Sequence, residues 1–177
     1  MHSKEEIKKG LSDIFNSTHN IIAQVDKNKF NKRNNGKWSV AQNIEHLILS
    51  NNITALSLAT PKIGLKQLFG LNSATNQNYD EIVWKYQMHL ANGAKASVAF
   101  QPKFGFIQAR PFLTILWKNS CANVLNALSN WTEHDLDTYV VQHPIIGKIT
   151  VRELLFFTVY HTKHHQQTIS MLQKSNK

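Results

Sequence analysis

Two histidines near the end of the chain have a spacing that suits a shared metal ion. His161 and His165 are four residues apart in a segment whose apolar residues recur at helical intervals from Val151 to Leu172. On a helix, such residues have β-carbons ~5–6 Å apart, which lets both rings reach one ion at ~2.0–2.1 Å. Both histidines lie near the middle of the apolar side, where a neutral imidazole is costly unless it has a partner. A metal ion would satisfy both rings.

A catalytic metal site of the zinc type has three protein ligands and one open position, so a third ligand is needed. His46, within WSVAQNIEHL, is the best candidate because no other histidine lies in its predicted helix. It shares a side with Leu49 and Ile53, so we expect this helix to pack on two fronts, with His46 facing the last helix. The larger apolar cluster of the same helix lies nearly opposite and comprises Val40, Ile44, Ile48 and Leu58. The residues alone leave open that all three histidines are hydrogen-bonded core side chains.

A ligand imidazole also needs a partner for its second nitrogen. Four nearby side chains could provide one, and the sequence does not choose among Asn43, Glu45, Tyr160 and Thr162. His164 lies at the edge of the same helix face, where it either supports the ligands from outside or faces the surface.

Other chemistry has less support in the sequence. Cys121 is more typical of a small buried residue than of a nucleophile, and Ser39 is better explained as a helix cap. The chain contains no glycine-rich phosphate loop, no CxxC and no GxSxG motif.

Helical periodicity and end signals place four main helices. Ser39 with Gln42, and Thr150 with Glu153, have the spacing of a capping box, and Pro111 suits a helix's first turn. The predicted helices run from Ser3 to about Asp26, from Val40 to about Ala59 before Pro61, from Pro111 past Leu128, and from Thr150 to about Gln173. This pattern predicts an all-α four-helix bundle in one domain covering residues 1–177.

The second and third helices are separated by about fifty residues, which is far more than a hairpin needs. We expect this crossover to span the bundle and to carry a short accessory helix from Asp80 to about Asn92. Three segments lack a helical period and are predicted to be irregular: Lys62–Asn78, Phe100–Ala109 and Trp131–Gly147.

Composition excludes several classes of protein. The chain is 42% hydrophobic, which excludes intrinsic disorder, and no run approaches the ~18 apolar residues of a membrane span. The single cysteine and a first decapeptide too charged for a signal peptide predict a cytoplasmic protein.

The net charge of +9 raises nucleic acid or an anionic small molecule as a partner. The densest basic stretch contains five cations interspersed with asparagines, namely Lys27, Lys29, Lys32, Arg33 and Lys37. It is typical of a flexible, solvated loop, and no nucleic-acid-binding motif surrounds it, so we expect no nucleic-acid partner.

Two long segments resemble the DinB-like superfamily of damage-inducible-type metalloenzymes, and the resemblance extends from about Ile7 to Leu172. These two segments are WSVAQNIEHL and GKITVRELLFFTVYHTKHHQQTI. A third segment, YDEIV with the later GAKA, is similar to the accessory segment of one branch of that superfamily. The resemblance implies an up-down-down-up bundle, a homodimer, and one divalent ion, zinc or nickel. The family's ligand positions correspond here to His46, His161 and His165.

The better understood branches of this superfamily include thiol-dependent transferases and isomerases, which act with low-molecular-weight thiols. The resemblance therefore implies such an activity for this chain. Our first interpretation is therefore a cytoplasmic metalloenzyme acting on a small-molecule substrate, either by hydrolysis or by thiol transfer. The basic surface would suit an anionic thiol cosubstrate. The alternative is a non-catalytic helical module that binds a metal, a ligand or nucleic acid, and steep salt dependence would mark the nucleic-acid version.

Overall fold

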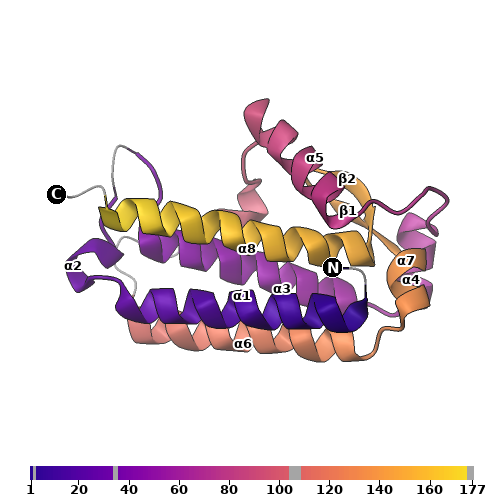
Figure 1. The fold of residues 1–177 in the computed structure, drawn as a ribbon, viewed down its shortest axis with the longest axis horizontal. Helices are drawn as coiled ribbons and strands as arrows, with labels where there is room; N and C mark the ends of the chain where they lie inside the picture. Colours follow the sequence, from indigo (N-terminus) through magenta and orange to yellow (C-terminus); the bar gives the residue numbers. More distant parts are fainter. Residues whose placement is uncertain (2, 34–35, 104–108, 175–177) are drawn as a thin grey trace.

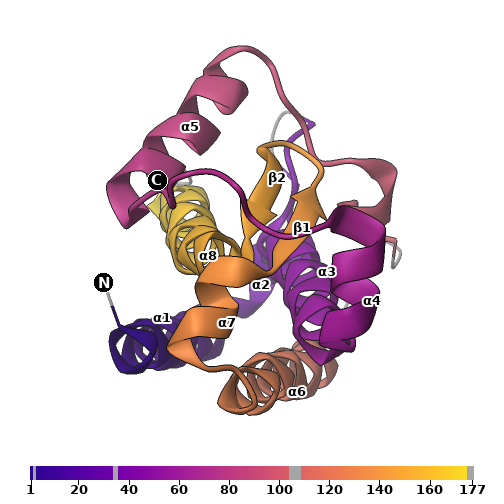
Figure 2. The ribbon, with the colours of Figure 1, turned by 90° about the vertical axis from the view of Figure 1, so that its right-hand side faces the viewer.

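The long helices form a four-helix bundle. The computed structural model describes residues 1, 3–33, 36–103 and 109–174. The four helices are α1 (Lys4–Gln24), α3 (Val40–Ala59), α6 (Arg110–Ser129) and α8 (Val151–Lys174). In Figures 1 and 2, α1 packs on α6 and α8, and α3 packs on the same two helices. The predicted all-α bundle is confirmed.

Hydrogen bonds between helix ends show the direction of each helix. At one end of the bundle, Lys4 Nζ donates to the carbonyl of Ser129, 3.1 Å away. At the other end, Arg110 Nη2 donates to the carbonyl of Val25 at 2.5 Å, so α1 and α6 are antiparallel. Figure 1 shows that α3 runs with α6 and that α8 runs with α1. This is the expected up-down-down-up course.

Local capping fixes where two of these helices begin. The Ser39 hydroxyl accepts from Gln42 N at 3.2 Å, and Gln42 Oε1 accepts from Ser39 N at 3.0 Å. The Thr150 hydroxyl accepts from Glu153 N at 3.2 Å, and Glu153 Oε2 accepts from Thr150 N at 2.7 Å. Each pair satisfies backbone donors that a helix start otherwise leaves unpaired, so both predicted capping boxes are confirmed.

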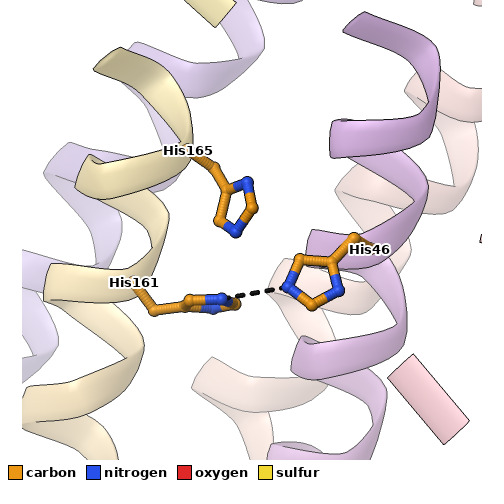
Figure 3. Close-up of side chains that lie close together, drawn as sticks. All are labelled: His46, His161 and His165. Atoms are coloured by element: carbon orange, nitrogen blue, oxygen red, sulfur yellow. Dashed lines mark hydrogen bonds between the residues drawn. The ribbon is translucent and has the colours of Figure 1, made fainter. Parts of the chain in front are cut away.

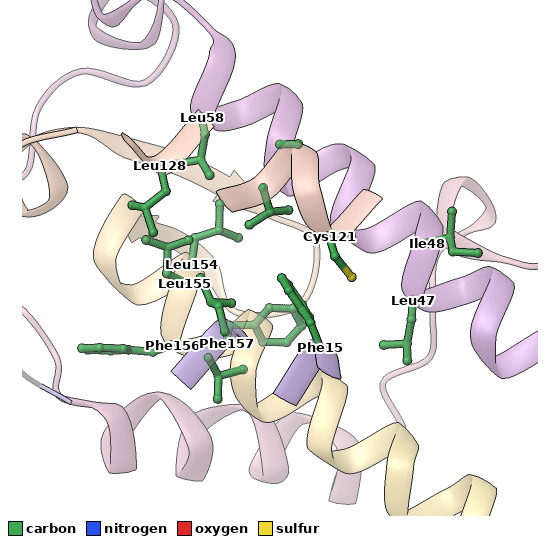
Figure 4. Packing of buried hydrophobic residues seen from close by; sticks show 14 of the residues in the cluster. Phe15, Leu47, Ile48, Leu58, Cys121, Leu128, Leu154, Leu155, Phe156 and Phe157 are labelled. Carbon is green, nitrogen blue, oxygen red and sulfur yellow. The ribbon is translucent and has the colours of Figure 1, made fainter. Parts of the chain in front are cut away.

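The bundle core holds large side chains from all four helices, and Figure 4 shows part of it. Trp117 of α6 is almost fully buried, and its Nε1 donates to the carbonyl of Phe15 in α1 at 3.3 Å. Trp131, just after α6, likewise donates to the carbonyl of Leu58 in α3 at 3.0 Å. Burying one large apolar side chain contributes ~1.5–3 kcal/mol, so this core holds α3 firmly against its neighbours.

The crossover carries the predicted accessory helix. It is α5 (Tyr79–Ala91), capped by Asn78, and the short 3₁₀ turn η1 (Val98–Phe100) follows it. The irregular link predicted at Phe100–Ala109 is described only to residue 103 and at 109, and the rest lies outside the described residues.

Two short helices occupy segments for which the sequence prediction was wrong. The basic stretch contains α2 (Lys27–Phe30), because Asp26 caps it and Phe30 is buried. The predicted connection at Lys62–Asn78 contains α4 (Lys62–Phe69), whose Leu65 is buried. Both helices are held by tertiary burial of one side chain, which leaves no periodic signal in so short a segment.

A third correction concerns Trp131–Gly147, which is not irregular. It contains α7 (Glu133–Thr138) and β1 (Val140–His143), and β1 pairs antiparallel with β2 (Gly147–Thr150). Gly147 has φ 87°, which a glycine adopts without strain at the start of β2. Figure 2 shows this hairpin and α5 on the side of the bundle formed by α8 and α3.

Among the described residues, no helix combines sufficient length with sufficient apolar character to cross a bilayer.

Candidate metal centre

The three histidines singled out in the sequence meet between α3 and α8 (Figure 3). One ring nitrogen from each of His46, His161 and His165 lies within 4.8 Å of the others, and all three residues are buried. The Nε2 atoms of His46 and His161 are 3.0 Å apart. Nitrogens on a tetrahedral zinc ion are about 3.3 Å apart for bonds of ~2.0–2.1 Å. The cluster is therefore compatible with a metal-binding site.

The environment of α3 explains how His46 reaches α8. Residues 43–48 are all buried, so a complete turn of the helix is enclosed by neighbours on every side. This confirms that α3 packs on two fronts, with Ile44 buried as well as His46. His161 and His165 reach the same point because they are one turn apart on α8.

Two of the rings are held in a defined orientation by their second nitrogen. His165 Nδ1 donates to Asn43 Oδ1 at 2.7 Å, and Asn43 Nδ2 donates to the carbonyl of Ser39 at 2.8 Å. His46 Nδ1 donates to the carbonyl of Phe100 at 2.7 Å. Because both Nδ1 atoms carry the proton, the Nε2 atoms of His46 and His165 present lone pairs. The lone pair of His46 accepts from His161 Nε2 at 3.0 Å, and this proton would have to leave Nε2 of His161 for an ion to bind there.

Asn43 is thus the one of the four candidate partners that orients a ligand histidine. Glu45 Oε1 accepts from the backbone N–H of Lys103 at 2.6 Å, and the Tyr160 hydroxyl accepts from Gln87 at 2.7 Å. Thr162 donates to the carbonyl of Thr158, one turn earlier in α8. The Phe100 carbonyl was missed by the sequence analysis, because a backbone group in a loop leaves no trace in residue type or spacing.

Electrostatics keep the three rings neutral. Burial lowers the pKa of His46, although the bond to Phe100 opposes this effect. Burial and the neighbouring imidazoles hold the pKa of His161 and of His165 well below the usual 6.5. Neutral imidazole is the form that binds metal ions, so the lowered pKa values reduce competition from imidazolium formation at pH 7.

Aromatic rings surround the cluster and limit its contact with water. The ring centroids of Trp38 and His46 are 5.0 Å apart, and Phe157 stacks on His161 at 4.9 Å. His164 is half-buried, with its ring centroid 5.3 Å from that of His165, but it is not a member of the three-histidine cluster. Its predicted position at the edge of the ligand face is therefore confirmed.

Cys121 and Ser39 have the structural roles expected of them. Cys121 is buried between α3 and α6, and burial raises the pKa of its thiol to about 12. A thiol with so high a pKa is not a nucleophile at neutral pH. Ser39 is the N-cap of α3.

Comparison with known proteins identifies the family of the chain. A model of the DinB superfamily matches residues 11–169, a range that contains all three clustered histidines. No curated protein matches the chain. With the family model covering most of its length, this chain belongs to the DinB superfamily.

Proposed function

We propose that His46, His161 and His165 hold one divalent metal ion, zinc or nickel, at the catalytic centre of an enzyme. The observation that carries this proposal is the convergence of three buried imidazoles, two of them with Nε2 lone pairs turned inward by bonds at Nδ1. Three neutral histidines match the ligand set of a catalytic site, which keeps one coordination position open. The open position is what separates an enzyme from a structural metal site.

Once bound, the ion would either lower the pKa of a water molecule or stabilise a thiol as its thiolate. The chain's own residues have preparatory roles. Asn43 and the Phe100 carbonyl fix the tautomers of His165 and His46. Trp38 and Phe157 cover the rings of His46 and His161, which limits the access of water from their sides and strengthens electrostatic interactions at the site.

Of the two reactions, we propose thiol transfer with a low-molecular-weight thiol cosubstrate. A hydrolytic site commonly uses a carboxylate as general base, and no Asp or Glu is present among the described residues that line the adjoining cavity. Glu45 is next to His46 in sequence, but its carboxylate accepts from Lys103 N. In the transfer, the thiol loses its proton, its sulfur bonds to a substrate carbon, and the leaving group departs with the electron pair and takes up a proton.

The metal content of protein purified without a metal-affinity tag or chelator tests the centre. We expect about one zinc or nickel ion per chain, and its loss in a His161→Ala, His165→Ala variant. A His89→Ala, His134→Ala variant is the matched control, because it also removes two histidines but from outside the cluster. The proposal is wrong if the protein carries no metal and does not bind added zinc or nickel.

Thiol binding needs a separate measurement. In cobalt-substituted protein, added 2-mercaptoethanol should produce a sulfur-to-cobalt charge-transfer band, because a thiolate would enter the open position. A cobalt spectrum that 2-mercaptoethanol leaves unchanged would count against thiol transfer and in favour of hydrolysis.

A further inference from the structure

A cavity of about 190 Å³ adjoins the three histidines and opens between the bundle and the crossover. Its walls come from α3, α5, η1, the β1–β2 hairpin and α8. His46, His161 and His165 all line it, so a molecule in the cavity would lie against the proposed metal centre. The properties of the other walls therefore determine which substrate group fits there.

The walls are mainly aromatic and aliphatic. They include the side chains of Trp38, Leu90, Phe100, Ile145 and Phe157. Among the described lining residues there is no Lys, Arg, Asp or Glu. Within the described part of the chain, the Lys and Arg side chains are thus on other surfaces.

Three of the hydroxyl groups in the walls are already engaged with their own helices. Ser50 and Ser57 donate to carbonyls one turn earlier in α3, each at 2.9 Å. Thr158 donates in the same way to the carbonyl of Leu154 at 2.8 Å. In metal-free protein, an anionic group in the cavity would therefore meet no Lys or Arg side chain among the described walls and none of these three hydroxyl protons, and burying an unpaired charge costs several kcal/mol.

His143 is a polar group of the cavity wall whose tautomer is fixed by the neighbouring turn. Its Nδ1 accepts the backbone N–H groups of Ile145 and Ile146 at 3.2 and 3.1 Å. The neutral ring therefore carries its proton on Nε2, at the opposite end from the turn. An N–H of this kind suits a neutral acceptor such as a carbonyl oxygen.

We infer that the substrate group in this cavity is uncharged and largely apolar, about the size of a single aromatic ring, and bears a carbonyl-type acceptor. An engineered apolar cavity of ~150 Å³ in another protein binds benzene, so the volume is adequate for a ring. The inference rests on the proposed function for its link to the metal centre. It assigns the substrate class of that site: the sulfur of a thiol cosubstrate would reach the metal centre, and any anionic groups that the thiol carries would lie outside the cavity.

Benzamide and benzoate test the inference because they share a ring and differ in charge. Binding to the full chain is measured by calorimetry, first as purified and then after chelation of metal. In the chelated protein we expect benzamide to bind at least about tenfold more tightly than benzoate. Benzoate binding as tightly as benzamide, or no binding of benzamide, would overturn the inference.

A pair of variants locates the binding. Ser57→Phe fills the cavity and should abolish benzamide binding. Ser12→Phe is the matched control, since Ser12 also donates to the carbonyl one turn earlier, but it lines a different cavity between α1 and α6. Unchanged benzamide binding in Ser57→Phe would contradict the assignment. Because chelated protein is used, this result does not depend on whether the metal centre exists.

Discussion

Asn43→Ala tests whether the orientation of His165 contributes to metal binding. The Asn43 amide oxygen accepts from His165 Nδ1 at 2.7 Å, and Asn43 is 2% exposed. Without this bond the proton can move to Nε2, the atom that should bind the ion. Loss of such a supporting bond typically costs 10–100-fold in metal affinity, or about 1.4–2.8 kcal/mol. We expect this range, together with a stability loss of ~1–3 kcal/mol from the buried nitrogen left without a partner.

Competition with a chromophoric zinc chelator measures the affinity, and urea unfolding measures the stability. Asn51→Ala is the matched control, because Asn51 is equally buried in α3 but contacts Ser120 and Cys121 of α6. It should lose stability while its zinc affinity changes by less than about twofold. The reasoning is refuted if folded Asn43→Ala binds zinc as tightly as the unaltered protein, or if both variants lose affinity equally.

Two further predictions follow from the pKa shifts. Burial lowers the pKa of the three clustered histidines and lowers that of His143 to about 4, so below about pH 6.5 the unfolded chain binds more protons than the native protein. The unfolding free energy of metal-free protein, measured by urea unfolding, should therefore fall from pH 7 to pH 5. The contribution of His143 to this loss should reach about 3 kcal/mol by pH 4, and an unfolding free energy that does not change with pH would contradict the pKa shifts. Since burial raises the pKa of Cys121 to about 12, iodoacetamide at pH 8 should leave native protein unmodified and alkylate it in urea, as mass spectrometry would show. Rapid labelling of native Cys121 would mean that the thiol is accessible.

The long helices could be predicted from the sequence because their determinants are local. The Ser39–Gln42 and Thr150–Glu153 capping boxes involve residues three apart, and both have the expected hydrogen bonds. The short elements could not be predicted in this way. In α4 only Leu65 is buried, and the β1–β2 hairpin is stabilised by pairing and by packing on α8.

For the site, the sequence determined the ligand candidates. The four-residue spacing of His161 and His165 on an apolar helix face requires only helix geometry. His46 was the candidate third ligand because no other histidine lies in its predicted helix, and the resemblance to the superfamily supported it. On a helical wheel of α3, His46 lies nearly opposite the larger apolar cluster, so the wheel alone did not show whether His46 is buried. In the structure, neighbours enclose this turn of α3 on all sides.

Only the tertiary structure decided what surrounds those ligands. It selected Asn43 from four candidate partners, brought in the Phe100 carbonyl from the crossover, and formed a cavity without charged walls among its described residues. The physical reason is that helix formation and capping depend on neighbours a few residues apart. The partners of a buried imidazole and the lining of a cavity depend instead on segments that are distant in sequence and meet only when α3, α8 and the crossover pack together.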